Sequence, residues 1–354
     1  MTTLSGVYAP PPLRERLLLM TRNHGWVDLF FLPIVIVGLA IYFSTASPYF
    51  FTSYNLTNLF VQGSILAFVA FGVTFVILIG ELDLSVGSGV ALGSVLASDV
   101  MLHSNSILLG IVVALTTGAV IGLVNGVVVA LFEVPSFIAT FAMLIIAQGV
   151  ALAVTNGGVI APIPAAIGNL ANDSFLGLRW VLWLVLLVFA VLYIVQTQTA
   201  FGRRVFAIGG NREAARLAGI PVRRIRVMTF VLSGITMGIA AIALTSRLIS
   251  GQPNGGGLLE LDAVTAIVIG GTSIAGGKGS LVRTFEGVLL IAMLRNGLDL
   301  IGVNDNLKQV IIGTALVAAT SVAFIRGRRR NRFARSSGAF PPKPAESVGA
   351  PTSA

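Results

Sequence analysis

The sequence has no cysteine and only two histidines, His24 and His103, in 354 residues. A chain without cysteine forms no disulfide and offers no thiolate, and two histidines cannot build a histidine-rich site, so we expect neither a metal nor another cofactor. Charge is also scarce, because Asp, Glu, Lys and Arg make up 10% of the residues, against about 25% in a soluble domain. A water-exposed surface needs more ionisable side chains than this. The composition therefore excludes a soluble domain and predicts a polytopic membrane protein.

Long apolar runs fill the space that charge leaves, since 55% of the residues are hydrophobic and the mean hydropathy is +0.93. A helix of roughly 20 residues spans a bilayer core of about 30 Å. Runs of this kind predict an all-α, polytopic transmembrane helical bundle of about 8–10 spans, with two interrupted Gly-rich helices, the third and the eighth. The runs cover residues 27–45, 57–79, 84–102, 106–131, 136–155, 179–197, 227–246, 261–275, 280–301 and 309–326.

The basic residues are clustered beside these runs and give the chain a net charge of +9. Sixteen of the 23 lie before the first run, in the loop 198–226, or in the segment 326–335. This is the positive-inside pattern, so we expect the loop and both termini to be cytoplasmic. An RNA-binding tail is the alternative that we set aside, and we expect no nucleic-acid partner. The C-terminal basic run can also contact anionic membrane lipid.

We divide the chain into a cytoplasmic N-terminal tail (1–26), a transmembrane domain (27–326) and a basic, then Pro-rich C-terminal tail (327–354) that we expect to be disordered. The first apolar patch, at 17–20, is too short for the apolar region of a signal peptide, so we expect no cleavage. Within the domain, GAVIGLVNG and GITMG space small residues four apart. Such spacing favours close packing of helices in lipid over ligand binding. The glycines concerned are Gly118, Gly122, Gly126, Gly234 and Gly238.

Two Gly-rich breaks, ILIGELDLSVGS (77–88) and IVIGGTSIAGGKGS (267–280), resemble each other. Paired interrupted helices are typical of transporters. Acidic residues near the first break, Glu81 and Asp83, fit helix capping or packing better than contact with a solute. Farther on, Arg295 and Asp299 are four residues apart, which predicts an ion pair on one helix.

The sequence carries no motif of an enzyme. AGGKGS differs from the phosphate-binding loop G-x-x-x-x-G-K-[ST], because Thr272 stands where the first glycine is required and Gly279 where serine or threonine is. HExxH is absent, and two histidines near span ends give no Ser-His-Asp arrangement. We therefore expect a protein that is not an enzyme and does not hydrolyse ATP itself.

The loop between the sixth and seventh spans contains a short helix. In AIGGNREAARLAGI, we expect a turn at Gly209-Gly210, an N-cap at Asn211, a helix over 212–218 and a stop at Gly219. About two turns of helix are unstable alone in water. The small apolar residues Ala214, Ala215, Leu217 and Ala218 fit either a groove on a partner protein or the membrane surface.

This loop resembles the coupling loop of ATP-binding cassette (ABC) importer permeases of the ribose/xylose class. Further stretches resemble the same family in the same order over about residues 55–325. These stretches are GELDLSVGS (80–88), VPSFIATFAM (134–143), ELDAVTAIVIGGTSIAGGKGS (260–280) and LRNGLDLIGV (294–303).

The resemblance implies an all-helical permease of the bacterial inner membrane that works as a pair, here a homodimer, on a cytoplasmic ABC ATPase. It also implies that a periplasmic or lipid-anchored sugar-binding protein delivers the substrate to the outer side, where Asp173, Glu260, Asp262 and Asp305 would lie. The residues implied in ATPase coupling are Gly209, Gly210, Asn211, Arg212, Glu213, Ala214, Ala215, Leu217 and Gly219. Those implied near the translocation path are Glu81, Asp83, Ser85, Asn125, Thr272 and Ser273.

The expected function is therefore an ATP-driven importer of a monosaccharide, and the Glu at position 81 favours a pentose such as xylose or ribose within this family. The alternative is an ion-coupled secondary transporter of a small polar solute. A secondary transporter needs acidic residues deep in the bundle, and Glu286 is the one isolated candidate.

Overall fold

The computed structural model describes residues 26–315, 317 and 321, and this part of the chain is almost entirely helical. The two expected tails lie outside these residues, apart from Trp26. The apolar patch at 17–20, where we expected no signal-peptide cleavage, lies outside them too. The last expected run, 309–326, is described only in part. The helices are α2 (Trp26–Ala46), α3 (Ser53–Leu78), α4 (Val86–Ser104), α5 (Ile107–Ala130), α6 (Ser136–Thr155), η1 (Ala165–Gly168), α7 (Asn169–Asn172), α8 (Trp180–Gln198), α9 (Ala200–Gly210), α10 (Arg212–Leu217), α11 (Val222–Leu248), α12 (Leu259–Ile269) and α13 (Leu281–Leu300).

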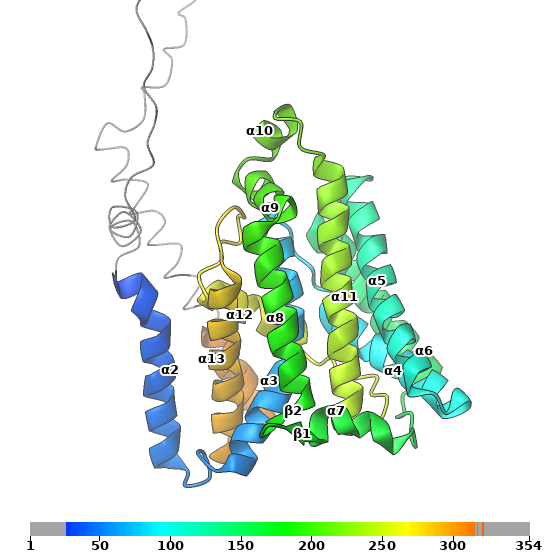
Figure 1. The fold of residues 1–354 in the computed structure, drawn as a ribbon, viewed down its shortest axis with the longest axis vertical. Coiled ribbons are helices and arrows are strands. Elements are labelled where there is room, and N and C mark those ends of the chain that lie inside the picture. The colour runs from blue at the N-terminus through cyan, green and yellow to red at the C-terminus, as the bar shows by residue number, and fades with distance from the viewer. Residues whose placement is uncertain (1–25, 316, 318–320, 322–354) are drawn as a thin grey trace, which may run out of the picture.

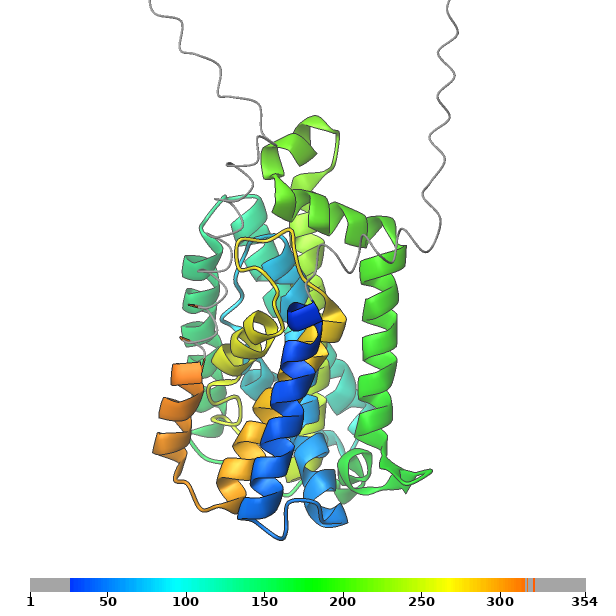
Figure 2. The same cartoon turned by 90° about the vertical axis from the view of Figure 1, so that its left-hand side faces the viewer.

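The long helices stand side by side as a bundle with two different ends (Figure 1). At one end, α9 lies across the bundle and α10 projects beyond it, as Figure 2 also shows. We call this the α10 end. At the other, the hairpin end, lie α7 and a two-stranded antiparallel hairpin, β1 (Ser174–Phe175) and β2 (Leu178–Arg179).

Polar residues before several helices explain where those helices begin. Thr52 accepts a hydrogen bond from the amide of Asn55 at the start of α3, and Ser106 accepts one from Leu109 at the start of α5. Thr199 does the same for Gly202, so the chain turns from α8 into α9 at this residue. Each side chain satisfies an amide that the first helical turn leaves without a partner.

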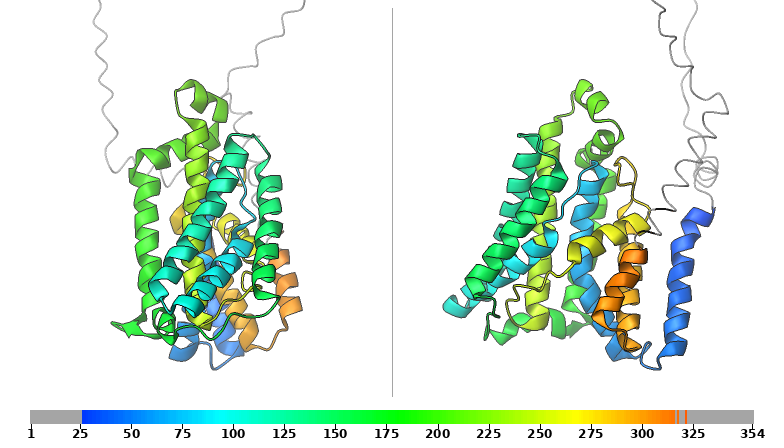
Figure 3. Two further views of the ribbon diagram at one scale, coloured as in Figure 1. Left: turned by 90° about the vertical axis from the view of Figure 1, so that its right-hand side faces the viewer. Right: turned by 180° about the vertical axis from the view of Figure 1, so that it is seen from behind.

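The centre of the bundle is α3, in which every residue from Gly63 to Ile79 is buried. The flanks are apolar and exposed, with α5 and α6 on one side of the molecule and α2 on the other (Figures 1 and 3). Leu108 of α5, Ile138 of α6 and Ile34 of α2 are each more than half exposed, at 70%, 57% and 67%. Helices that are apolar all round fit a lipid environment.

Six helices are long and apolar enough to cross a membrane: α3, α4, α5, α6, α8 and α11, among the residues that the structure describes. The apolar part of α2 is shorter, and α12 and α13 cover two further expected runs. The Gly-rich interruptions lie between helices. One follows α3 and precedes α4, and the other separates α12 from α13.

The glycine faces predicted from the sequence are confirmed as packing surfaces between α5 and α11. A Cβ atom added at Gly118 would lie 2.1 Å from the carbonyl oxygen of Gly234, and one added at Gly122 would lie 2.3 Å from that of Phe230. Backbones therefore touch where these helices cross. Lipid supplies no hydrophobic force between helices, so close backbone packing stabilises this crossing.

Candidate functional site

Both Gly-rich breaks begin with the same helix-ending motif. After α3, Gly80 has φ +77°, and the amide of Glu81 donates to the Val76 carbonyl at 3.1 Å. After α12, Gly271 has φ +87°, and the amide of Thr272 donates to the Ile267 carbonyl, also at 3.1 Å. This is the Schellman arrangement, in which glycine takes a left-handed conformation. The similarity of the two breaks in sequence thus corresponds to the same local backbone.

The two breaks and the end of α9 meet at one place, which we call the junction: Leu78, Gly80, Gly209, Gly276 and Gly277. The amide of Gly277 donates to the Leu78 carbonyl at 2.9 Å. A Cβ atom at Gly209 would lie 1.8 Å from that carbonyl oxygen and 2.4 Å from the Gly277 nitrogen. Three segments distant in sequence are therefore in main-chain contact near the α10 end.

Glu81 connects the first break to both α10 and α11. Its Oε1 atom lies 2.6 Å from a guanidinium nitrogen of Arg212 and 2.6 Å from one of Arg226. Glu81 and Arg226 are buried, whereas the side chain of Arg212 is 48% exposed. A buried charge is stable only when it is paired, so the carboxylate holds both arginines in place. The predicted path residue Glu81 and the predicted coupling residue Arg212 are thus in direct contact.

Asp83 is the centre of a second, fully buried polar group. Its carboxylate accepts hydrogen bonds from the Ser85 amide and hydroxyl at 3.1 and 2.6 Å, and from the Ser233 hydroxyl at 3.0 Å. Asn125 in turn donates to the Ser85 hydroxyl at 2.8 Å. α4 has Ser85 as its N-cap residue and no side-chain cap, so neither Glu81 nor Asp83 caps this helix. Both carboxylates are buried and paired within the protein, which fits the packing role that was expected as the alternative to capping.

The second break carries Thr272 and Ser273, the other residues predicted near the path. Thr272 is buried, and its hydroxyl makes no hydrogen bond within the described part of the chain. Ser273 bonds through its amide to the Lys278 carbonyl, which closes the loop of the break. The structure therefore places Glu81, Asp83, Ser85 and Asn125 around the first break, with Thr272 and Ser273 in the second.

The short helix of the loop is confirmed as α10. The Asn211 side chain caps it by accepting from the Ala214 amide at 2.9 Å, and Gly219 ends it with φ +78°. The expected turn at Gly209-Gly210 is wrong, because α9 continues through Gly210 and the chain turns at Asn211. Glycine at 209 instead allows the close contact at the junction.

α10 is attached to the bundle on one face and exposed on the other. Ala215 is buried, whereas Leu217 is 75% exposed. On the exposed face, Arg216 hydrogen-bonds to Glu213 and thereby lowers the pKa of Glu213, which stays ionised at neutral pH. The Arg212–Glu81 ion pair supplies the support that two turns of helix need.

Charged residues of α12 and α13 differ from the sequence-based expectation. Arg295 pairs with Asp262 at 2.5 Å and not with Asp299, which pairs with Lys308. Asp262 and Glu260 are buried in the first turn of α12, and their place on the outer side of the membrane stays a prediction. Asp262 lies on α12 and Asp299 on α13, the helix of Arg295 itself, so the packing of α12 against α13 determines which carboxylate Arg295 contacts.

The sequence reasoning missed a cavity of about 190 Å³ between α3, α11, α12 and α13. None of the six residues predicted near the path lines it. Its polar lining residues are Gln62, Arg247, Asp262 and Arg295. A detectable signal existed, since Gln62 and Arg247 interrupt apolar runs.

Residues 55–320 match the family model described as "Branched-chain amino acid transport system / permease component". The ribose import permease protein RbsC of Escherichia coli is 41% identical over 289 residues, which are 79% of this chain and 88% of that protein. No solved structure matches the chain.

Two further relatives carry other sugar names. The L-arabinose ABC transporter permease protein AraH of Azospirillum brasilense is 36% identical and covers 92% of this chain and 94% of its own length. The xylose transport system permease protein XylH of Escherichia coli is 34% identical and covers 83% and 91%.

Proposed function

The chain belongs to this family of ABC-importer permease components, and from that premise we propose that it carries a pentose across the membrane. It is a multi-pass inner-membrane subunit of an ATP-driven monosaccharide importer, and a separate ATPase hydrolyses the ATP. The named relatives take ribose, L-arabinose or xylose, all of them pentoses, which supports the choice of sugar.

Energy coupling is proposed to pass through α10. The exposed face of α10, with Leu217 and the Glu213–Arg216 pair, would dock on the ATPase. Motion of α10 would then act on Glu81 through Arg212, and on Leu78 and Gly277 through Gly209. The single observation that carries this proposal is the contact of Glu81 with Arg212, because it joins the docking helix directly to a break in a central helix.

The two breaks are proposed to form the moving part of the path. They are irregular backbone within a bundle of long helices, which a membrane protein tolerates only inside protein or beside a water-filled cavity. The group formed by Asp83, Ser85 and Asn125 would hold the first break in one of two packings. Thr272 and Ser273 would act in the second. Sugar would pass when the breaks change their packing together.

The remaining partners follow from the two ends and the flanks of the bundle. A substrate-binding protein, periplasmic or lipid-anchored, would dock at the hairpin end, opposite the ATPase. A second copy of this chain and membrane lipid would cover the exposed apolar flanks. Both termini would then be cytoplasmic, on the side of the arginine-rich loop.

The test is reconstitution into liposomes. The complete importer, with ATPase, binding protein and ATP, is expected to accumulate ribose, xylose or arabinose, and the purified chain alone is expected to accumulate none. Accumulation by the chain alone under a proton or sodium gradient would instead establish the ion-coupled transporter. In that case Glu286→Gln should abolish uptake, whereas in an ABC importer it should leave uptake unchanged.

A further inference from the structure

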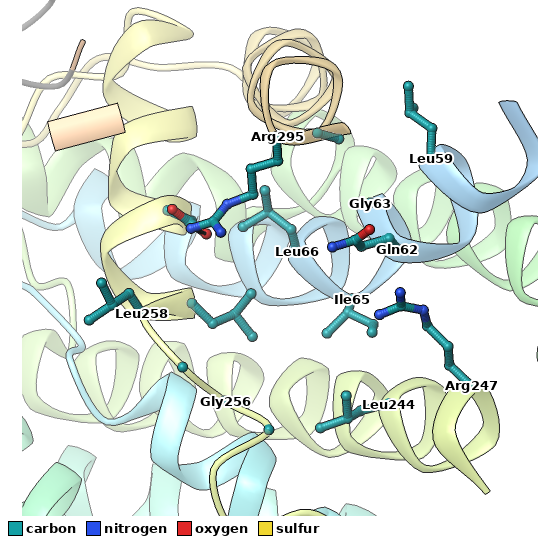
Figure 4. A pocket seen from close by; sticks show the side chains of 15 residues that line it. Leu59, Gln62, Gly63, Ile65, Leu66, Leu244, Arg247, Gly256, Leu258 and Arg295 are labelled. Atoms are coloured by element: carbon teal, nitrogen blue, oxygen red, sulfur yellow. Dashed lines mark ion pairs between the residues drawn. The ribbon is translucent and has the colours of Figure 1, made fainter. Parts of the chain in front are cut away.

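The cavity between α3, α11, α12 and α13 lies in the half of the bundle away from α10. Figure 4 shows Gln62 of α3, Arg247 of α11 and Arg295 of α13 around it. Arg247 belongs to the last turn of α11, and Gln62 to the first half of α3, which both lie toward the hairpin end. The cavity therefore precedes the junction for a solute that enters from the hairpin end.

The cavity walls combine apolar side chains with a few polar ones. Ile65, Leu66 and Leu244 supply apolar surface, and Gly255, Gly256 and Gly257 expose the main chain. Apolar walls with a small number of convergent polar groups are typical of sites for small molecules. The volume, about 190 Å³, is below the roughly 300–1,000 Å³ of sites for drug-sized ligands, which limits the ligand to a small solute.

The polar groups of the cavity are only partly satisfied. Arg295 and Asp262 form an ion pair across it, but the buried Nε atom of Arg295 makes no hydrogen bond within the described residues. Gln62 and Arg247 likewise make no side-chain hydrogen bond or ion pair to any residue that the structure describes, although the charge of Asp299 acts on Arg247 from farther away. Polar groups in an apolar bundle cost free energy unless they find partners, so this set is suited to a ligand rich in hydrogen-bonding groups.

The charges of the lining favour a neutral ligand. Asp262 compensates Arg295, and Arg247 lies at the exposed end of its helix, where water also reaches it. The lining offers donors on Gln62, Arg247 and Arg295 and acceptors on Gln62 and Asp262. A hydroxyl group both donates and accepts, so a polyhydroxylated solute can satisfy all of them.

We propose that this cavity is an outward-half binding site for a neutral monosaccharide, in which Gln62, Arg247 and the Arg295–Asp262 pair hydrogen-bond to the sugar hydroxyls. This inference rests on the proposed function and adds to it a site that none of the residues implied by the family resemblance lines. The sugar would occupy the cavity before the breaks at the junction change their packing.

The absence of native cysteine provides a clean test, because one introduced thiol is the sole target of a thiol reagent in this chain, whose labelling is read from its own band on a gel. Leu258 lines the cavity and is 40% exposed, so Leu258→Cys should react with a neutral maleimide. We expect ribose, xylose or arabinose to slow this reaction several-fold in the assembled importer. Tyr54→Cys is the control, because Tyr54 lies on the same helix as Gln62, is 80% exposed and is outside the cavity. The sugars should not change its labelling.

Variants of the lining test the role of the polar groups. Gln62→Met and Arg247→Met, each combined with Leu258→Cys, remove hydrogen-bonding groups while keeping long side chains. Each should raise the half-protecting sugar concentration by about three- to tenfold, as expected for the loss of one hydrogen bond. Unchanged thermal unfolding would confirm that the variants fold. If both folded variants have the same half-protecting sugar concentration as Leu258→Cys alone, the proposal is overturned.

The outcomes separate this proposal from the proposed function. If the complete importer accumulates no pentose, the proposed function is wrong. If it accumulates pentose but saturating sugar leaves Leu258→Cys labelling unchanged, the importer stands and the site is overturned. Protection by ribonate in preference to ribose would overturn the assignment of a neutral ligand.

Discussion

A single carboxylate holds two arginines from two different helices near the α10 end. Arg226 is buried, so without Glu81 its charge would lack compensation inside the protein. Arg212 is half exposed and can be solvated by water when it leaves. The two arginines are therefore unequal: one partner fixes the carboxylate in the fold, and the other is free to transmit motion.

Replacement of Glu81 tests the buried half of this arrangement. Glu81→Gln should lower the free energy of unfolding by about 3 kcal/mol, because breaking a buried ion pair leaves an uncompensated charge. Thermal unfolding of the purified protein measures the loss. Glu133→Gln is the matched control, since Glu133 pairs with Arg223 at 3.2 Å on the surface, where a pair contributes about 1 kcal/mol or less. Equal effects of both substitutions would contradict the assigned burial.

Replacement of Arg212 tests the exposed half. Arg212→Ala leaves the Glu81–Arg226 pair in place, so unfolding should change by about 1 kcal/mol or less. Sugar uptake per ATP hydrolysed should nevertheless fall strongly, because α10 loses its side-chain contact with the break. Simultaneous measurement of uptake and ATP hydrolysis in liposomes detects this uncoupling. Normal uptake would show that the ion pair only stabilises the fold.

At the level of elements, the end of α9 is distinguished by two adjacent glycines with different surroundings. A Cβ atom at Gly209 meets backbone of both breaks, whereas one at Gly210 has nothing within 4 Å. The sequence GG gives no hint of this difference. Only the packing of α9 against the breaks assigns a role to the first glycine and leaves the second unconstrained.

These neighbours form a matched pair of substitutions. Gly209→Ala should destabilise the protein by about 1–3 kcal/mol, because backbone atoms must shift to make room, and it should reduce uptake. Gly210→Ala should leave stability unchanged or raise it by up to about 1 kcal/mol, because alanine favours a helix over glycine. Thermal unfolding and uptake are the measurements. Loss of uptake in Gly210→Ala alone would refute the junction.

Local signals were enough to predict the elements but not their contacts. Asn211 and Gly219 mark the start and end of α10 through chemistry that is present within a few residues. By contrast, the Glu81–Arg226 pair joins residues that are 145 positions apart in the sequence. Arg295 pairs with Asp262 and not with Asp299 because α12 lies beside α13. Such contacts depend on the fold as a whole, which also explains why the cavity was missed.

For the molecule as a whole, the crossing of α5 and α11 is the test of glycine packing. Gly234→Ala places a Cβ atom 2.1 Å from the carbonyl oxygen of Gly118, so the helices must separate at a cost of about 1–3 kcal/mol. Gly149→Ala on α6 is the control, because nothing lies within 4 Å of its Cβ position. A lower melting temperature for Gly234→Ala alone is the expected result, and equal melting temperatures would contradict the crossing.

The spacing of glycines and the length of apolar runs predicted this membrane architecture well, because both are properties of single helices in lipid. Six of the ten expected runs correspond to helices that are long and apolar enough to cross a membrane, among the described residues. The burial of Glu260 and Asp262 was not predicted, since a charge pattern does not reveal which residues a neighbouring helix covers.

Contact at the junction is made by carbonyl oxygens and amides of Leu78, Gly209 and Gly277 and by no side chain in particular. Main-chain contacts of this kind need residues that are small enough for the backbones to touch. They do not need any particular side chain in the residues around them. Homologous permeases could thus diverge widely in side chains here and still share one way of passing a movement inward, provided that positions 209 and 277 stay without a Cβ atom.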